Sequence, residues 1–196
     1  MTVLCDLAFK YGSDKCPQIK HFYTQFYYDL LKDRRESVRK VVEIGIGCPQ
    51  NMNDYPGYRI GASLYMWRDF FPNAMIYGAD ILPESMFQDE RIRTVLCDQT
   101  VSMDLVRLVE ETGSDIDLFI DDGCHVPVAQ LFTCLTVVPL LDEKAIYIIE
   151  DVGTIGIIHG LRDGLKEYNC RRVGRERKLG RDDRLIMVTR KEEGSG

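Results

Sequence analysis

Short apolar runs rich in β-branched residues recur along the chain from Val41 onward. They have the length and composition of buried strands and occupy residues 41–47, 74–81, 93–99, 116–123 and 144–152. Stretches with helical periodicity separate them, at residues 63–71, 102–111 and 126–141. Strands that alternate with helices predict an α/β fold, a mostly parallel sheet with helices on both faces. Ser63 and Ser102 open the first two helices, where we expect each to act as a cap.

The two ends of the chain carry patterns of their own. Apolar side chains at helical spacing within residues 1–40 predict a packed N-terminal helix; they are Tyr23, Phe26, Tyr27, Leu30 and Leu31. Residues 155–168 predict another helix, followed by an antiparallel hairpin of residues 170–178 and 184–190. We therefore expect an N-terminal helical segment over 1–40, one α/β domain over 41–191 and a flexible tail over 192–196.

Composition narrows the class of protein. The 196 residues include 25 Lys and Arg against 31 Asp and Glu, a net charge of −6, so no positive field would attract nucleic acid. The most apolar run, residues 131–141, is far shorter than the roughly 18 residues of a membrane helix, and Asp6 interrupts any signal-peptide core. The seven cysteines lack metal or redox spacing. We expect a cytoplasmic protein with reduced thiols and neither nucleic-acid nor membrane partners.

Acidic residues gather where the predicted strands end. In an open parallel sheet, ligands bind outside the carboxyl ends of the strands, so these residues are candidates for a site. They are Glu43, Asp80, Asp98, Asp121, Asp122, Glu150 and Asp151. Any one of them could instead be a helix cap or an ion-paired surface group, but a chain that only builds a core has no need of the whole set.

The first two strand ends predict a nucleoside cofactor. Gly45 and Gly47 let the backbone approach a ligand closely, and Asp80 could accept hydrogen bonds from both ribose hydroxyls. The long polar loop at 48–60 does not enter a helix directly, as a pyrophosphate site requires. The pattern therefore favours S-adenosylmethionine over NAD, and an NAD-linked oxidoreductase ranks last.

The run DDGCH, residues 121–125, predicts a second functional cluster beside Glu150 and Asp151. Strand alternation sends Asp121 and Asp122 to opposite sides, so they should have different roles. Asp122, Glu150 and Asp151 together offer hard oxygen ligands suited to Mg²⁺ or Ca²⁺. His125, with an ordinary pKa near 6.5, is then a candidate general base; its alternative role is to cap the following helix.

These residues resemble a known family. The run YGSDK at 11–15, His21 with Tyr23, and the segments VVEIGIG, IDLFIDDGCH and YIIEDV resemble the S-adenosylmethionine-dependent sugar O-methyltransferases of antibiotic pathways. The resemblance covers most of residues 9–151 and implies a class I methyltransferase fold, with seven strands and a C-terminal hairpin. Cys124 stands where the family usually has Ser, and the stretch 51–58 is longer than in the family and could be a substitute lid.

The resemblance also implies roles for single residues. It implies Mg²⁺ or another hard divalent cation at Asp122, Glu150 and Asp151, with His125 as catalytic base. It implies contacts to S-adenosylmethionine from a larger set: Tyr11, Lys15, Glu43, Gly45, Ser63, Asp80, Asp98, Gln99 and Asp121. Tyr11 and Lys15 are expected to close over the cofactor.

The resulting hypothesis is a methyltransferase catalytic domain acting on a sugar hydroxyl of a glycan or glycosylated metabolite. Two alternatives stay open: methylation of a catechol or other small phenol, and a non-catalytic module that binds S-adenosylmethionine and regulates a partner. The acceptor is open because the family usually carries extra segments that shape its pocket. The assembly is open too, a homo-oligomer being one option.

Overall fold

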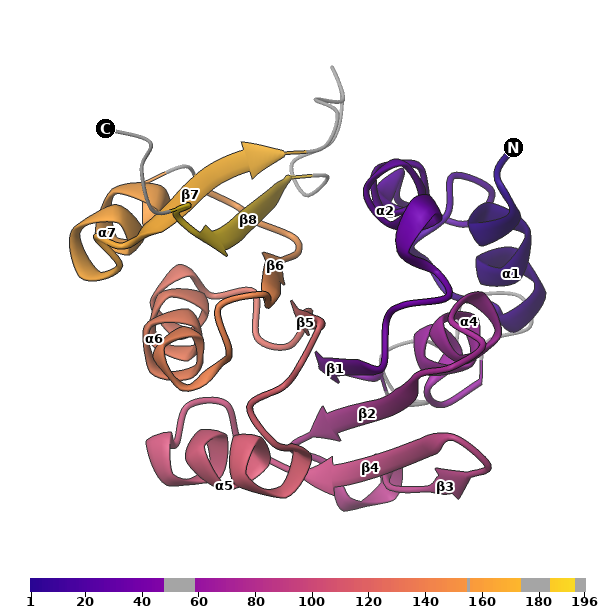
Figure 1. The fold of residues 1–196 in the computed structure, drawn as a ribbon. Coiled ribbons are helices and arrows are strands. Elements are labelled where there is room, and N and C mark those ends of the chain that lie inside the picture. The colour runs from indigo at the N-terminus through magenta and orange to yellow at the C-terminus, as the bar shows by residue number, and fades with distance from the viewer. Residues whose placement is uncertain (48–58, 155, 174–183, 193–196) are drawn as a thin grey trace.

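A computed structural model describes residues 1–47, 59–154, 156–173 and 184–192 (Figure 1). Within these residues, eight strands form one sheet in the order β3-β4-β2-β1-β5-β6-β8-β7. The strands are β1 Lys40–Ile44, β2 Met75–Asp80, β3 Gln88–Asp89, β4 Ile92–Leu96, β5 Leu118–Asp121, β6 Ile146–Ile149, β7 Tyr168–Val173 and β8 Leu185–Arg190. The five central strands β4, β2, β1, β5 and β6 are parallel, as predicted.

The sheet ends as the sequence predicts, with one addition. β7 and β8 form an antiparallel hairpin, and β8 also pairs antiparallel with β6. The predicted extension of the hairpin to residue 178 lies outside the described residues, as does the tail beyond Glu192. The expected sheet has seven strands; the eighth is the two-residue β3, which pairs antiparallel with β4 at the opposite edge.

Helices cover both faces of the sheet (Figure 1). One layer contains α1 Val3–Tyr11, α2 Tyr23–Leu31 and α4 Ala62–Phe70, and the other contains α5 Ser102–Thr112, α6 Pro127–Val137 and α7 Ile157–Gly164. Short 3₁₀ turns lie at η1 Lys32–Arg34, η2 Pro83–Ser85 and η3 Val138–Leu140. No helix in the described part of the chain is long and apolar enough to span a membrane.

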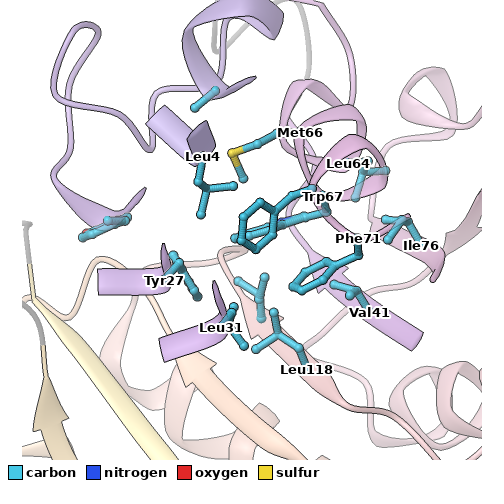
Figure 2. Close-up of a cluster of buried hydrophobic side chains, with 14 of the residues drawn as sticks. Leu4, Tyr27, Leu31, Val41, Leu64, Met66, Trp67, Phe71, Ile76 and Leu118 are labelled. Atoms are coloured by element: carbon cyan, nitrogen blue, oxygen red, sulfur yellow. The ribbon is translucent and has the colours of Figure 1, made fainter. Parts of the chain in front are cut away.

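Both faces of β1, β5 and β6 are buried, which explains their continuous apolar runs. Along β6, Ile146 and Ile148 pack under the N-terminal helices while Tyr147 and Ile149 pack under α6 and α7. Figure 2 shows the first of these cores, where side chains of α1, α2 and α4 meet the sheet around Trp67.

Two local expectations need correction. α4 begins after Gly61, which has a left-handed φ of 68°, and α5 begins after Val101; neither Ser63 nor Ser102 is a cap. Ser63 is the second residue of α4, and its hydroxyl donates to Glu43 instead of to the helix backbone. The N-terminal segment contains two helices rather than one, because Thr2 caps α1 and Gly12 ends it.

Candidate active site

The site is a cavity of about 500 Å³ at the carboxyl ends of the parallel strands. β1 pairs with β2 on one side and β5 on the other, so the strand order reverses there and a crevice opens. The loops after β1, β2, β4, β5 and β6 line it, together with residues 13–15 from the N-terminal segment. The predicted edge of the sheet is therefore where the cavity lies.

Gly45 lets two backbones meet below the cavity. Its φ is +84°, and a Cβ atom there would lie 2.1 Å from the carbonyl oxygen of Asp122. A Cβ at Gly123 would lie 1.9 Å from Oε1 of Gln99. Only glycine fits at position 45, because the two backbones approach more closely than a side chain permits, whereas at position 123 the close neighbour is the side chain of Gln99.

Two carboxylates form one end of the cavity. Asp80 accepts hydrogen bonds from the backbone N–H groups of Ile46 and Leu82, each at 3.1 Å, which fixes its carboxylate at the end of β2. Asp98 accepts from both the backbone and the hydroxyl of Thr100, at 2.9 and 2.7 Å. Both line the cavity, as does Gln99.

Asp121 lies behind this wall rather than on it. It is 1% exposed and accepts from Gln99 Nε2 at 3.1 Å and from the Tyr147 hydroxyl at 3.2 Å. Burial raises the pKa of Asp121 to about 7. Asp121 does not line the cavity, so its contact with a cofactor stays a prediction; it holds Gln99, whose Oε1 accepts from the backbone of Cys124.

Asp122, His125 and Asp151 form the other end, with one possible ligand atom from each lying within 4.8 Å of the others. His125 Nε2 is 3.5 Å from Asp122 Oδ1, and His125 Nδ1 is 3.3 Å from Asp151 Oδ2. Asp151 has a φ of 50°, a left-handed conformation that aspartate tolerates better than most residues.

The electrostatics of His125 differ from those of a free histidine. Its hydrogen bond to Asp122 raises the pKa of His125 to about 9; partial burial opposes this shift, and the charges of Asp122 and Asp151 reinforce it. At neutral pH the imidazole is therefore protonated in this structure, whereas the sequence predicted an ordinary value near 6.5.

Lys15 lies beneath this group in a buried ionic network. Its ammonium is 2.6 Å from Asp122 Oδ2, 2.7 Å from Glu150 Oε2 and 3.3 Å from Glu43 Oε1, and the residue is 1% exposed. Burial opposes the charged form of Lys15, but the carboxylates outweigh it and raise its pKa. For Asp122, burial is likewise overcome, chiefly by Lys15, and the pKa falls to about 2.

Three further predicted site residues make their polar contacts with other side chains of the protein. Glu43 is fully buried and accepts from Ser63 Oγ at 2.7 Å and Trp67 Nε1 at 2.6 Å. Tyr11 donates to Asp69 and stacks on Tyr65. Neither lines the cavity. Lys15 does reach it, and its ammonium binds the three carboxylates; its contact with a cofactor stays a prediction.

Glu150, the third predicted metal ligand, is bound by the N-terminal segment in this structure. Its Oε1 accepts from the Tyr27 hydroxyl at 2.6 Å and its Oε2 accepts from Lys15, so it does not join the group around His125. Burial raises its pKa well above the ordinary value. The structure thus places two of the three predicted metal ligands, Asp122 and Asp151, beside His125.

Sequence reasoning missed the part played by Tyr23 and Tyr27. Their spacing was interpreted as an apolar helix face, yet the hydroxyl of Tyr23 donates to Asp151 and that of Tyr27 to Glu150. Tyrosine, rather than phenylalanine or leucine, at buried positions of this helix is the available signal, because a buried hydroxyl needs a partner. The predicted lid at 51–58 lies outside the described residues.

The fold and the cavity define the class of protein. The MycE methyltransferase of the mycinamycin pathway, solved with Mg and SAH, has a TM-score of 0.77 and 25% identity, covering 100% of this chain and 56% of that one. Human methyltransferase-like protein 13, solved with SAH, has a TM-score of 0.57 at 15% identity and covers 97% of this chain and 81% of that one. The chain has the class I methyltransferase fold.

Sequence relatives make this more specific. The chain is 35% identical over 151 residues to an 8-demethyl-8-alpha-L-rhamnosyl tetracenomycin-C 2'-O-methyltransferase of Streptomyces olivaceus, covering 77% of this chain and 38% of the relative. It is 33% identical over 155 residues to the mycinamicin VI 2''-O-methyltransferase of Micromonospora griseorubida, covering 77% and 36%. No family model matches the sequence. The chain is a homologue of these sugar O-methyltransferases, which confirms the resemblance, and it spans less than half the length of the curated relatives it matches.

Proposed function

We propose that this chain is an S-adenosylmethionine- and Mg²⁺-dependent O-methyltransferase that acts on a sugar hydroxyl of a glycosylated small molecule. One observation carries the proposal: a single cavity has hydrogen-bond acceptors at one end and the Asp122, His125 and Asp151 group at the other. Methyl transfer to a hydroxyl needs this pairing, a cofactor site beside a place where a proton can be removed.

The first end of the cavity fits S-adenosylmethionine. Asp80 keeps free lone pairs for the ribose hydroxyls, because each of its oxygens accepts one backbone N–H bond. Gly45 lines the cavity, and its close approach to the Asp122 backbone joins the loops after β1 and β5 beneath the ligand. The cavity volume is within the range of small-molecule sites, about 300–1,000 Å³. We assign Gly45, Ser63, Asp80, Asp98 and Gln99 to the cofactor.

The second end fits a hard divalent cation. Asp122 and Asp151 present carboxylate oxygens, the ligands that Mg²⁺ prefers. Burial raises the pKa of Asp151, and repulsion from Asp122 adds to the effect. A bound cation would relieve that repulsion. Positive charge beside the two carboxylates would also weaken their hold on the imidazolium of His125 and so favour its neutral form.

The chemistry follows from these assignments. S-adenosylmethionine supplies a methyl group activated by its sulfonium, and Mg²⁺ supplies a Lewis acid for the acceptor hydroxyl. His125 would accept the proton of the acceptor hydroxyl as its oxygen takes the methyl group, and S-adenosylhomocysteine would be the leaving product. The walls of the cavity would orient the two reactants, and orientation of this kind accounts for much of the acceleration in such reactions.

The proposal extends to the whole chain. The catalytic domain would comprise residues 41–191, while the segment 1–40 supplies Lys15 and Tyr23 to the site.

The six described cysteines are free thiols, which fits a reducing cytoplasm. The relatives' names specify rhamnosyl and mycinamicin acceptors for those proteins, and a sugar on a small molecule is the acceptor class we infer here.

Mass spectrometry tests the reaction. The purified chain is incubated with S-adenosylmethionine, with and without Mg²⁺, and with a rhamnosylated aromatic compound or a catechol, and products are searched for a gain of 14 daltons. We expect methylation of the sugar that EDTA abolishes and that His125→Ala slows roughly 10²–10⁴-fold while SAH still binds. Methylation of catechol alone would identify a phenol methyltransferase, and SAH binding without turnover of any acceptor would identify a non-catalytic module.

A further inference from the structure

We propose that Tyr23 is a positioning residue for the metal-binding carboxylate of Asp151, a role that rests on the proposed function. The Tyr23 hydroxyl donates to Asp151 Oδ1. The other oxygen, Oδ2, is the one 3.3 Å from His125 Nδ1. Tyr23 thus engages one carboxylate oxygen and leaves the second facing the site.

Two more contacts keep this arrangement in place. The backbone N–H of Asp151 donates back to the Tyr23 hydroxyl at 3.3 Å, so side chain and backbone are tied to one atom. The Tyr23 ring stacks on His21, with ring centroids 4.6 Å apart and planes 3° apart. Tyr23 is 2% exposed and is the first residue of α2, so its ring has no room to turn away.

A parallel arrangement exists at the second carboxylate. Lys15 binds Asp122 Oδ2 at 2.6 Å and leaves Asp122 Oδ1 facing His125 Nε2. Glu150 is different, because Tyr27 and Lys15 engage both of its oxygens. The N-terminal segment thus engages one oxygen of each carboxylate that faces His125 and both oxygens of Glu150.

The consequence for a cation is an affinity effect. A carboxylate held by a second group presents its free oxygen in one orientation, and loss of such an outer partner typically weakens metal binding about 10–100-fold. Tyr23 is the sharper test of this idea than Lys15, since Tyr23→Phe removes one hydroxyl whereas loss of Lys15 leaves three buried carboxylates without their cation.

The experiment compares two matched variants of α2. Tyr23→Phe removes the hydroxyl that donates to Asp151, and Tyr27→Phe removes the hydroxyl that donates to Glu150. Of these two carboxylates, only that of Asp151 faces His125. Mn²⁺ binding is measured by electron paramagnetic resonance, with SAH affinity and melting temperature measured on the same samples. We expect Tyr23→Phe to weaken Mn²⁺ binding roughly 10-fold, at the lower end of outer-partner effects, with less than a twofold change in SAH affinity. Tyr27→Phe should leave Mn²⁺ affinity within twofold of wild type, whatever its cost in stability.

Two results would overturn the role of Tyr23. Unchanged Mn²⁺ affinity in Tyr23→Phe would show that Asp151 needs no positioning. Equal losses of Mn²⁺ affinity in both variants would show that each hydroxyl acts only through the stability of the fold. A wild-type chain that binds no Mn²⁺ would instead refute the proposed metal site itself, so the two failures are distinguishable.

Discussion

Gly45 offers a direct test of how the fold builds the site, through the substitution Gly45→Ala. An alanine there must adopt the left-handed φ of +84°, and its Cβ would lie 2.1 Å from the Asp122 carbonyl oxygen and 2.6 Å from the Cα of Gly123. The conformation costs about 1–2 kcal/mol for a non-glycine residue. Relief of the overlap costs about 1–3 kcal/mol more, because both neighbours are backbone atoms that move only with β5 and its loop. The expected loss of unfolding free energy is the sum, about 2–5 kcal/mol.

The matched control is Gly153→Ala, which lies just beyond Asp151. A Cβ there meets no atom within 4 Å, so we expect a change within about 0.5 kcal/mol. Urea unfolding of both variants gives the free energies, and SAH and Mn²⁺ titrations report on the site. Since the displaced backbone carries Asp122, both ligands should bind more weakly to Gly45→Ala. A loss within about 1 kcal/mol of the control, with ligand binding intact, would refute the reasoning, because the backbone would then have room for a side chain.

Three other predictions concern single interactions. Titration of His125 by NMR should give a pKa near 9 in the wild type and a lower pKa in Asp122→Asn. Because the pKa lies above the 6.5 of an unfolded chain, the ion pairs of His125 stabilise the fold fully below pH 6.5, and this stabilisation is lost as the pH rises through about 9. A wild-type pKa of 6.5 would contradict the ion pairs. Asp80→Asn should weaken SAH binding roughly 10-fold with Mn²⁺ affinity unchanged, and equal losses of both would place Asp80 in a purely structural role. Trp67→Phe should cost about 1–3 kcal/mol in urea unfolding, because it leaves the buried Glu43 carboxylate without its 2.6 Å donor; a neutral result would show that Ser63 and Lys15 suffice.

The strands and the position of the site follow from local patterns in the sequence. The apolar runs are continuous, as in strands that are buried on both faces. A parallel sheet brings the carboxyl ends of such strands to one edge, so Asp80, Asp98 and Asp122 are expected to lie together. The alternation of side chains also predicted separate roles for Asp121 and Asp122. The structure agrees, with Asp121 behind Gln99 and Asp122 beside His125.

The partners that each acidic side chain binds depend on contacts between residues far apart in the sequence. Glu150 and Asp151 are neighbours in sequence, but Glu150 meets Lys15 and Tyr27 from the N-terminal segment, while the left-handed backbone of Asp151 turns its carboxylate toward His125. Local spacing carries no information on such partners, which lie 123 to 135 residues away for Glu150.

By itself, the sequence determined the α/β sheet, the acidic edge where its strands end and the family to which its motifs are similar. Only the tertiary structure decided which carboxylates keep an oxygen free for a ligand and which are engaged inside the protein. The physical reason is that hydrophobic periodicity is a property of neighbouring residues, whereas the state of a buried charge depends on every group packed against it.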